Sequence, residues 1–253
     1  MGERSKAHAD EVAALRLGID LGMTLIDTAE IYGDGGSEKV VADAIEGQRD
    51  QVFVVTKVSP RNASRTGVPK ACERSLKRLR IDAIDLYLLH WPSNTPLAET
   101  VEAFEQLRSA GKIRRWGVSN FDLEDMKELK GLPCSTNQVL YHVGERAIES
   151  DLLPWSQRNK IPIMAYSPVG RGRRLLNNAT LKKIAKRHDA TPAQIAIAWV
   201  LRQPDVIAIP KASNTTHVRE NAESVDIQLT DQDFADIDRE FPPPTSKEPL
   251  PML

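Results

Sequence analysis

The chain has 253 residues, of which 41% are hydrophobic and 27% are charged, a composition that fits one large α/β domain and excludes a disordered protein. Its 34 basic and 35 acidic residues are interspersed and leave a net charge of −1, which excludes the basic surface that nucleic acid or an anionic membrane attracts. We therefore expect no nucleic acid and no membrane as partners, and a small molecule as ligand.

The cysteines and the first residues indicate a compartment. Cys72 and Cys134 are far apart and lack a CxxC spacing, and residues 1–6 are charged, without the apolar segment of a signal peptide. We expect a reduced, cytoplasmic protein. The five histidines include neither an HExxH motif nor a Cys/His cluster, so no metal site is expected.

The chain begins with alternating helix and strand signals. Apolar residues at helical spacing predict a helix at 12–21, and a short strand at 24–26 leads into Asp27. A glycine-rich turn follows, after which we expect Ser37 to cap a helix at 38–45.

A second strand, at 52–57, carries Lys57 at its end, and a helix at 69–79 follows it. The run at 84–89 has the length and composition of a buried parallel strand. It ends abruptly at His90, because Trp91-Pro92 stops it.

The remainder of the chain repeats this alternation. Thr191 and Gln194 form a capping box with Pro192 at the first helical position. Regular alternation of strand and helix predicts a parallel sheet. The remaining strands are predicted at 113–118, 136–141, 161–165 and 206–209. The remaining helices are predicted at 97–110, from Asp122, at 152–159, as a double helical region at 178–203 whose second half starts at Thr191, at 215–224 and from 231 to Pro242.

The length and the alternation favour a (β/α)8 TIM barrel formed by a single domain, residues 1–253. Such a barrel has eight strands, and seven are visible in this sequence. Either the start is truncated or miscalled, or the barrel is left open with two unpaired edges, which is costly for a buried sheet.

Four polar residues follow successive strands: Asp27, Tyr32, Lys57 and His90. Each alone has a plain structural explanation, because a histidine after a strand is commonly structural and a lysine is commonly solvated. Together they would meet at the carboxyl face of a parallel barrel, which is the catalytic face. The sequence therefore predicts an active site that holds an acid, a phenol, an ammonium group and an imidazole.

Four motifs then indicate a family. In chain order they are Asp27-Thr28-Ala29, Leu88-Leu89-His90-Trp91-Pro92, Gly117-Val118-Ser119-Asn120-Phe121 and Ile209-Pro210-Lys211. With these motifs at strand ends, the chain resembles the aldo-keto reductases over residues 11–241, and most of all the bacterial members that reduce methylglyoxal. The resemblance implies a barrel that binds extended nicotinamide cofactor and reduces aldehydes and ketones, with Asp27, Tyr32, Lys57 and His90 as catalytic tetrad.

The chemistry of carbonyl reduction is consistent with these residue types. Hydride transfer leaves an alkoxide that must be protonated, and a tyrosine with a pKa near 10 is a poor donor at neutral pH unless a positive charge lowers that pKa. We expect Lys57 to supply the charge, Asp27 to keep Lys57 ionised, and His90 to orient the substrate oxygen. Tyr32 is then the general acid.

The resemblance also implies the cofactor contacts. Ser119, Asn120 and Gln138 would hold the nicotinamide carboxamide, and Tyr166 would stack on its ring. Gly170 and Gly172 would admit the pyrophosphate, whereas Arg171, Arg173 and Arg174 are either phosphate contacts or a solvated basic run. The implied set is Asp27, Ser119, Asn120, Gln138, Tyr166, Ser167, Pro168, Gly170, Ile209, Pro210, Lys211, Ala212, Ser213, Asn214, His217, Glu220 and Asn221.

Two of these positions depart from the family pattern. Ala212 stands where a serine commonly binds the 2′-phosphate, and His217 stands where an arginine usually does. A guanidinium grips phosphate with two hydrogen bonds and an imidazole cannot. NADPH remains the expected cofactor, with NADH as the alternative.

The substrate is expected to contact Tyr32, His90 and Trp91, and the short tail after Phe241 favours an open pocket for small carbonyls such as methylglyoxal. We expect a monomer or a weak homo-oligomer. Three other readings stay open. The first is a non-catalytic nicotinamide-binding regulatory subunit, and the second is an inactive N-terminally truncated form. The third is an aldolase-type barrel in which Lys57 forms a Schiff base.

Overall fold

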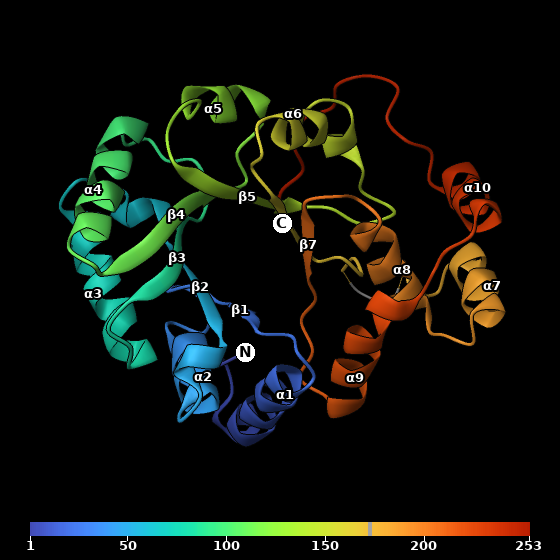
Figure 1. Ribbon diagram of the computed structural model, residues 1–253, viewed down its shortest axis with the longest axis horizontal. Helices are drawn as coiled ribbons and strands as arrows, with labels where there is room; N and C mark the ends of the chain where they lie inside the picture. Colours follow the sequence, from blue (N-terminus) through green and yellow to red (C-terminus); the bar gives the residue numbers. More distant parts are fainter. Residues whose placement is uncertain (172–173) are drawn as a thin grey trace. The chain divides into compact units, whose positions relative to one another are not determined.

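The computed structural model describes residues 1–171 and 174–253, in which strands and helices alternate along the chain (Figure 1). All seven predicted strands are present within these residues, each within two residues of its predicted start. They are β1 Leu25–Asp27, β2 Phe53–Val58, β3 Ile84–Leu89, β4 Ile113–Ser119, β5 Cys134–Leu140, β6 Ile163–Tyr166 and β7 Val206–Ile209.

The predicted helices are confirmed as well, and the region 178–203 holds two helices as predicted. The α-helices are α1 His8–Asp20, α2 Gly36–Ile45, α3 Gly67–Leu79, α4 Leu97–Ser109, α5 Leu123–Glu128, α6 Leu152–Arg158, α7 Ala179–Arg187, α8 Pro192–Leu201, α9 Thr215–Glu223 and α10 Asp231–Glu240. In the described ranges, no helix combines the length and the apolar character that crossing a membrane requires.

The chain divides into two compact units. The first comprises residues 1–119, 132–135 and 212–218, and the second comprises 120–131, 136–211 and 219–253. In the first unit, β1 to β4 pair side by side and parallel, and helices α2, α3 and α4 line one face of them (Figure 1). All six residues of β3 are buried, as a strand covered on both faces requires.

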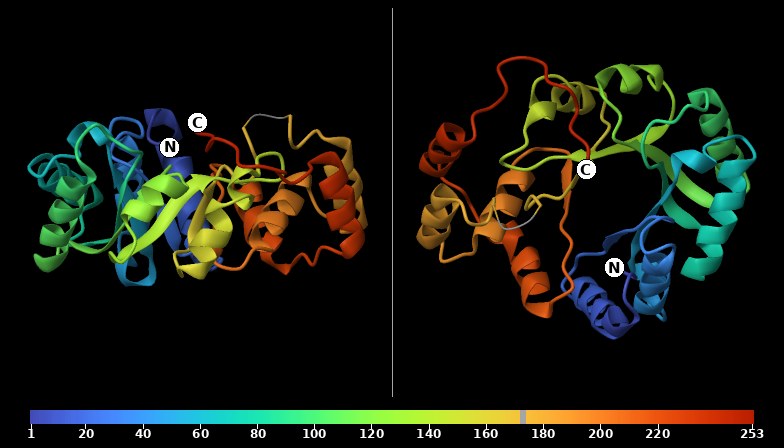
Figure 2. Two further views of the ribbon diagram at one scale, coloured as in Figure 1. Left: turned by 90° about the horizontal axis from the view of Figure 1, so that it is seen from above. Right: turned by 180° about the vertical axis from the view of Figure 1, so that it is seen from behind.

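In the second unit, β6 pairs in parallel with β5 and with β7. Helix α8 packs against β7, and α10 lies beside α7 in both views of Figure 2. The capping box predicted at Thr191 and Gln194 is confirmed, with Pro192 at the start of α8.

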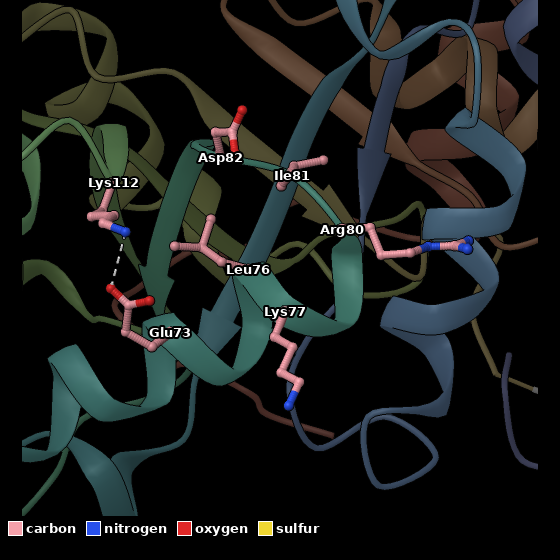
Figure 3. A pocket seen from close by; sticks show the side chains of 7 residues that line it. All are labelled: Glu73, Leu76, Lys77, Arg80, Ile81, Asp82 and Lys112. Carbon is pink, nitrogen blue, oxygen red and sulfur yellow. Dashed lines mark ion pairs between the residues drawn. The ribbon is translucent and has the colours of Figure 1, made fainter.

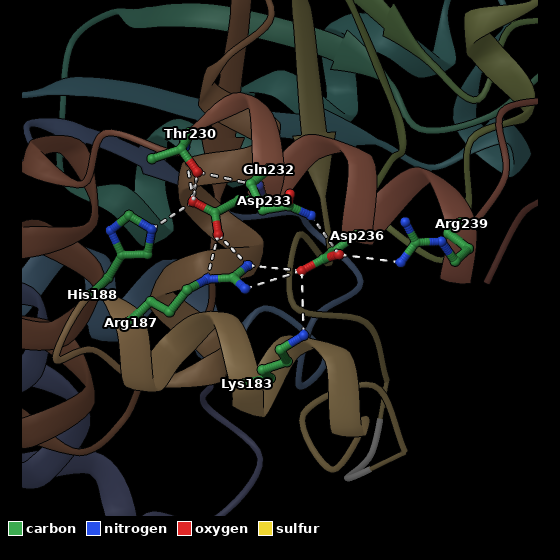
Figure 4. Close-up of polar contacts among 8 residues, drawn as sticks. All are labelled: Lys183, Arg187, His188, Thr230, Gln232, Asp233, Asp236 and Arg239. Atoms are coloured by element: carbon green, nitrogen blue, oxygen red, sulfur yellow. Dashed lines mark hydrogen bonds and ion pairs between the residues drawn. The ribbon is translucent and has the colours of Figure 1, made fainter.

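A buried acid joins α7 to α10 (Figure 4). Asp233 is fully buried and accepts hydrogen bonds from Arg187 Nε at 2.9 Å and His188 Nε2 at 2.7 Å, and Asp236 accepts from Arg187 as well. Burial raises the pKa of Asp233, but hydrogen bonds from Thr230, His188 and Arg187 outweigh it and lower this pKa below its usual range. The charge that holds α10 in place is therefore retained in mild acid.

The prediction that Ser37 caps a helix is wrong. Helix α2 begins at Gly36, and its N-cap is Gly35, which has a positive φ of 79°. Ser37 is already inside the helix and buried, and its hydroxyl oxygen accepts a hydrogen bond from the Thr28 hydroxyl at 2.9 Å. A glycine can enter the helix from the left-handed region at little cost, which leaves Ser37 to tie α2 to the end of β1.

We predict unequal effects when two arginines near the end of α3 are replaced. Glu38 is fully buried and accepts from Arg78 Nε at 2.5 Å, whereas the pair between Arg80 and Asp43 is exposed. Arg78→Met should lower the free energy of unfolding by about 3 kcal/mol, because it leaves a buried carboxylate without its cation. Arg80→Met should cost less than about 1 kcal/mol.

Urea denaturation of both variants at pH 7 measures this difference. Equal losses of stability would show that the Glu38 carboxylate does not depend on Arg78.

Candidate active site

Strand register brings Asp27, Lys57 and His90 to one face of the first unit. Asp27 pairs with Val55, and Lys57 pairs with Leu88. Side chains two residues apart on a strand point to the same side, so Lys57 lies on the side of Asp27, and His90 lies on the side of Lys57. Each of the three is at or near the carboxyl end of its strand, as predicted.

Lys57 is fully buried, and its ammonium group is surrounded by oxygen atoms. Its Nζ donates to Asp27 Oδ2 at 2.7 Å and to the Thr28 carbonyl at 2.8 Å, and it lies 3.5 Å from the Tyr32 hydroxyl oxygen. An ammonium group has three N–H donors, and these three oxygens account for all of them. The positive charge is thereby fixed beside the phenol.

Tyr32 lies in the turn between β1 and α2. Its hydroxyl oxygen is 3.4 Å from His90 Nε2, and the two rings meet edge to face with centroids 5.5 Å apart. The Tyr32 side chain is partly exposed, and the ring of Trp91 lies 4.8 Å from that of His90. The structure therefore brings together the four residues predicted as a tetrad, with Trp91 extending the wall of rings.

The pKa values differ in part from expectation. Burial raises the pKa of Tyr32, Lys57 lowers it, Asp27 raises it again, and the net direction is upward. Lys57 therefore lowers this pKa as expected, but burial has the larger effect and keeps the pKa above its ordinary value. Tyr32 consequently keeps its proton at neutral pH.

The pKa of His90 is shifted in the opposite direction, downward. Burial, and then the charge of Lys57, lowers the pKa of His90 to about 3. The imidazole is therefore neutral at physiological pH and retains a single N–H that can donate a hydrogen bond.

In the second unit, three of the predicted cofactor contacts lie together. The Tyr166 hydroxyl donates to Asn120 Oδ1 at 2.9 Å, and the Asn120 backbone N–H donates to the Gln138 carbonyl at 2.8 Å. Gln138 is buried and Tyr166 is half-buried at the end of β6. Two primary amides and an aromatic ring match the donors, acceptors and flat face of a nicotinamide, so these residues fit the group.

The remaining predicted contacts occupy loops and strand ends. Ser119 is buried at the end of β4. Residues 167–170 form a tight turn in which the Gly170 N–H donates to the Ser167 carbonyl at 2.8 Å. Arg171 and Arg174 are exposed, which agrees with a solvated basic run, and Gly172 and Arg173 lie outside the described residues.

The segment after β7 presents polar groups to solvent. Lys211, Ser213, Asn214 and His217 are exposed, and Asn214 Oδ1 accepts from the Thr216 N–H at 2.8 Å at the start of α9. The other predicted contacts in this segment, Ile209, Pro210, Ala212, Glu220 and Asn221, are half-buried.

Two residues of the Tyr32 turn were not predicted as part of the site. The Thr28 carbonyl accepts from Lys57, and Glu30 is a buried carboxylate bonded to the segment after β2. Backbone carbonyls carry no sequence signal. Glu30 stands three residues after the end of β1, and no local pattern in the sequence reveals its partners.

A surface pocket of the first unit lies elsewhere (Figure 3). It is lined by Glu73, Leu76, Lys77, Arg80, Ile81, Asp82 and Lys112, with an ion pair of 3.3 Å between Lys112 and Glu73. Residues 81, 82 and 112 precede β3 and β4, so this pocket is at the amino ends of the strands. It contains none of the predicted site residues. Among the described residues, no three His, Cys, Asp or Glu side chains are grouped so that they could hold a metal ion.

An α/β chain with parallel strands and a Lys, Asp, Tyr and His cluster at their carboxyl ends defines a class of barrel oxidoreductases, and comparison identifies the family. The sequence profile of the aldo/keto reductase family matches residues 2–240. The chain belongs to this family. The predicted family and the predicted reductase class of enzyme are therefore confirmed.

Named relatives and solved structures agree. Methylglyoxal reductase YeaE of Escherichia coli is 51% identical over 100% of this chain and 92% of its own length, and glyoxal reductase of Bacillus subtilis is 35% identical over 89% and 81%. A crystal structure of an aldo/keto reductase from Klebsiella pneumoniae in complex with NADP and acetate has a TM-score of 0.98 and 50% identity, covering 100% of this chain and 92% of that one. The predicted (β/α)8 fold class, with seven parallel strands among the described residues, is confirmed.

We predict that His90 makes the protein sensitive to acid. Below about pH 6.5 the unfolded state binds a proton at this histidine, whereas the folded state does not until about pH 3. The free energy of unfolding should therefore fall as the pH drops between these values. His90→Gln should remove roughly 2–3 kcal/mol of the decline between pH 7 and pH 4.5, because two pH units separate 6.5 from 4.5 and each corresponds to about 1.4 kcal/mol.

Urea denaturation of the wild type and the variant at both pH values measures the decline. The exposed His217 supplies a control for the loss of a histidine in general, and His90→Gln should decline less than His217→Gln. An unchanged decline in His90→Gln would contradict the assignment of a neutral His90.

Proposed function

We propose that this chain reduces small aldehydes and ketones to alcohols, with NADPH as hydride donor and Tyr32 as proton donor. One observation carries the proposal: a buried ammonium group, Lys57, is held by Asp27 at 2.7 Å and faces the Tyr32 hydroxyl at 3.5 Å. The Tyr32 hydroxyl in turn lies 3.4 Å from the Nε2 atom of His90.

When bound, the nicotinamide supplies a hydride to the carbonyl carbon of the substrate. Tyr32 gives its proton to the carbonyl oxygen, which leaves a phenolate. The Lys57 ammonium stabilises that phenolate as it forms, because a charge in a buried site interacts strongly with the developing negative charge. The Lys57 charge therefore lowers the energy of the transition state, in which the phenolate forms, while the Tyr32 phenol stays protonated before the reaction.

Asp27 and the Thr28 carbonyl keep the Lys57 side chain charged and in place. The neutral imidazole of His90 donates its N–H to the substrate oxygen and directs it toward the Tyr32 hydroxyl. In this arrangement the phenol and the imidazole both act as donors to one oxygen. Such paired donors are the usual means of stabilising a developing oxyanion.

The substrate is proposed to be a small carbonyl compound of the methylglyoxal kind. The names of the Escherichia coli and Bacillus subtilis relatives, a methylglyoxal and a glyoxal reductase, support this class. In the first unit, the rings of Tyr32, His90 and Trp91 adjoin one another, with centroid distances of 5.5 and 4.8 Å, and are proposed as the wall that contacts the substrate.

NADPH is the proposed cofactor, and the Klebsiella pneumoniae relatives solved with NADP and with NADPH support it. Ser119, Asn120, Gln138 and Tyr166 would hold the nicotinamide, and residues 167–170 the pyrophosphate. Lys211, Ser213, Asn214 and His217, all exposed to solvent, are proposed for the 2′-phosphate. Ala212 offers no hydroxyl there, so NADH remains the alternative cofactor.

Two other readings lose support. The assembled tetrad argues against a non-catalytic regulatory subunit. A Schiff-base lysine must present a free amine to its substrate, whereas Lys57 Nζ donates to Asp27 and to the Thr28 carbonyl.

The organisation of the chain remains a prediction. A single domain over residues 1–253 is supported by the family match, which runs from residue 2 to residue 240. We also propose a reducing compartment such as the cytoplasm, because Cys72 and Cys134 are both free thiols.

We predict that Tyr32→Phe lowers kcat for methylglyoxal by roughly 10²- to 10⁴-fold, the usual contribution of a positioned general acid. Oxidation of NADPH, followed by its absorbance, measures kcat. Tyr87→Phe is the matched control, because Tyr87 is a fully buried tyrosine within β3 whose hydroxyl is not part of the cluster. It should keep the turnover of the wild type.

The same assay tests the substrate class when the wild type is given methylglyoxal, glyoxal and a steroid ketone in turn. Near-normal turnover by Tyr32→Phe would reject its role as acid. Faster turnover of the steroid than of methylglyoxal would reject the proposed substrate class.

A further inference from the structure

The side-chain contacts of Tyr32 are too long to fix its position alone. Its hydroxyl is 3.4 Å from His90 Nε2 and 3.5 Å from Lys57 Nζ, at the outer limit of hydrogen bonding, and 37% of its surface is exposed. The position of this hydroxyl therefore depends on the backbone turn that carries it.

That turn continues the pairing of β1 with β2 beyond the end of β1. The Thr28 N–H donates to the Val55 carbonyl at 2.9 Å, and the Glu30 N–H donates to the Lys57 carbonyl at 3.2 Å. The backbone then reverses at Tyr32, whose N–H donates to the Ala29 carbonyl at 3.1 Å. Glu30 is the last residue before Tyr32 whose backbone is paired with β2 by these bonds.

The Glu30 side chain strengthens this attachment. Only 7% of it is exposed, and its Oε1 accepts from the Ser59 backbone N–H at 2.7 Å and from Asn62 Nδ2 at 2.9 Å. Its Oε2 lies 3.4 Å from Arg74 Nη2, on α3. Bonds from N–H groups to a carboxylate are about twice as strong as neutral ones, so this side chain joins the turn firmly to the segment after β2.

The contact between Glu30 and Ser59 connects the segment that carries the Tyr32 phenol with the segment that carries the Lys57 ammonium group. Glu30 is two residues before Tyr32, and Ser59 is two residues after Lys57. The bond between Glu30 and Ser59 therefore ties the turn that carries the phenol to the strand that carries the ammonium group. Proton donors must be held to within about 0.5 Å for full effect.

We propose that Glu30 is a positioning residue for carbonyl reduction, whose carboxylate fixes the Tyr32 turn to the end of β2. This inference rests on the proposed function of the same site. Glu30 touches neither substrate nor cofactor in this scheme. It acts through the placement of Tyr32.

The test compares Glu30→Gln with Asp85→Asn. Asp85 is a matched control, because it is also a buried acid that accepts from a backbone N–H of β2, that of Val54 at 2.9 Å, and from an arginine, Arg49 at 2.6 Å. It does so at the amino end of β3, at the opposite end of the strands from Tyr32. Both variants keep the shape of the side chain and remove its charge.

Glu30→Gln should lower kcat by about tenfold or more, because a displacement of about 1 Å in an active site can cost about 100-fold. The dissociation constant for NADPH, from quenching of tryptophan fluorescence, should stay unchanged. Asp85→Asn should lower the urea midpoint as Glu30→Gln does and leave kcat unaltered.

A double-mutant cycle separates placement of Tyr32 from general damage. In the Tyr32→Phe background, Glu30→Gln should cause no further loss of kcat, because the group it positions is already absent. If Glu30→Gln does not fold, Asn62→Ala removes one bond to the same carboxylate and should lower kcat in the same direction by a smaller factor.

Two results would overturn the inference alone: equal kcat values for Glu30→Gln and Asp85→Asn, or an undiminished effect of Glu30→Gln in the Tyr32→Phe background. A wild type that oxidises no NADPH with methylglyoxal would instead overturn the proposed function together with this inference.

Discussion

The proposed active site depends on keeping one ammonium group charged in the interior. Lys57 is fully buried, and an isolated buried charge is costly unless it is paired and hydrogen-bonded. Asp27 and the Thr28 carbonyl meet that need at 2.7 and 2.8 Å. Both come from the end of β1 and the turn after it, so the parallel pairing of β1 with β2 is what makes the charge tolerable. The turn that compensates Lys57 is the same turn that carries Tyr32.

Burial shifts the pKa values of the Tyr32 phenol and the His90 imidazole in opposite directions. It raises the pKa of Tyr32 and lowers that of His90, and the Lys57 charge reinforces the shift at His90 while opposing the shift at Tyr32. The phenol therefore keeps its proton and the imidazole loses its extra one. Both groups are left neutral, each with a hydrogen to donate to a carbonyl oxygen. This protonation state suits reduction of an aldehyde or ketone.

Much of this arrangement could be predicted from the sequence. An apolar run that ends in His90 or Asp27 fixes both a strand and the position of its last side chain, so strands and tetrad were predicted together. The capping residue of α2 was not, because the glycine turn lets the helix begin one residue before Ser37. The pKa of Tyr32 and the partners of Glu30 also escaped prediction. They depend on the depth of burial and on contacts between distant segments, which no local pattern specifies.

The central claim is that the Lys57 charge enables Tyr32 to deliver a proton to a carbonyl oxygen. The most direct measurement is methylglyoxal-dependent oxidation of NADPH by the wild type and by Lys57→Met, with binding of NADPH followed by tryptophan fluorescence. The account predicts turnover by the wild type and a loss of at least about 100-fold in the variant, while NADPH still binds. Undiminished turnover in Lys57→Met, or none in the wild type, would contradict it.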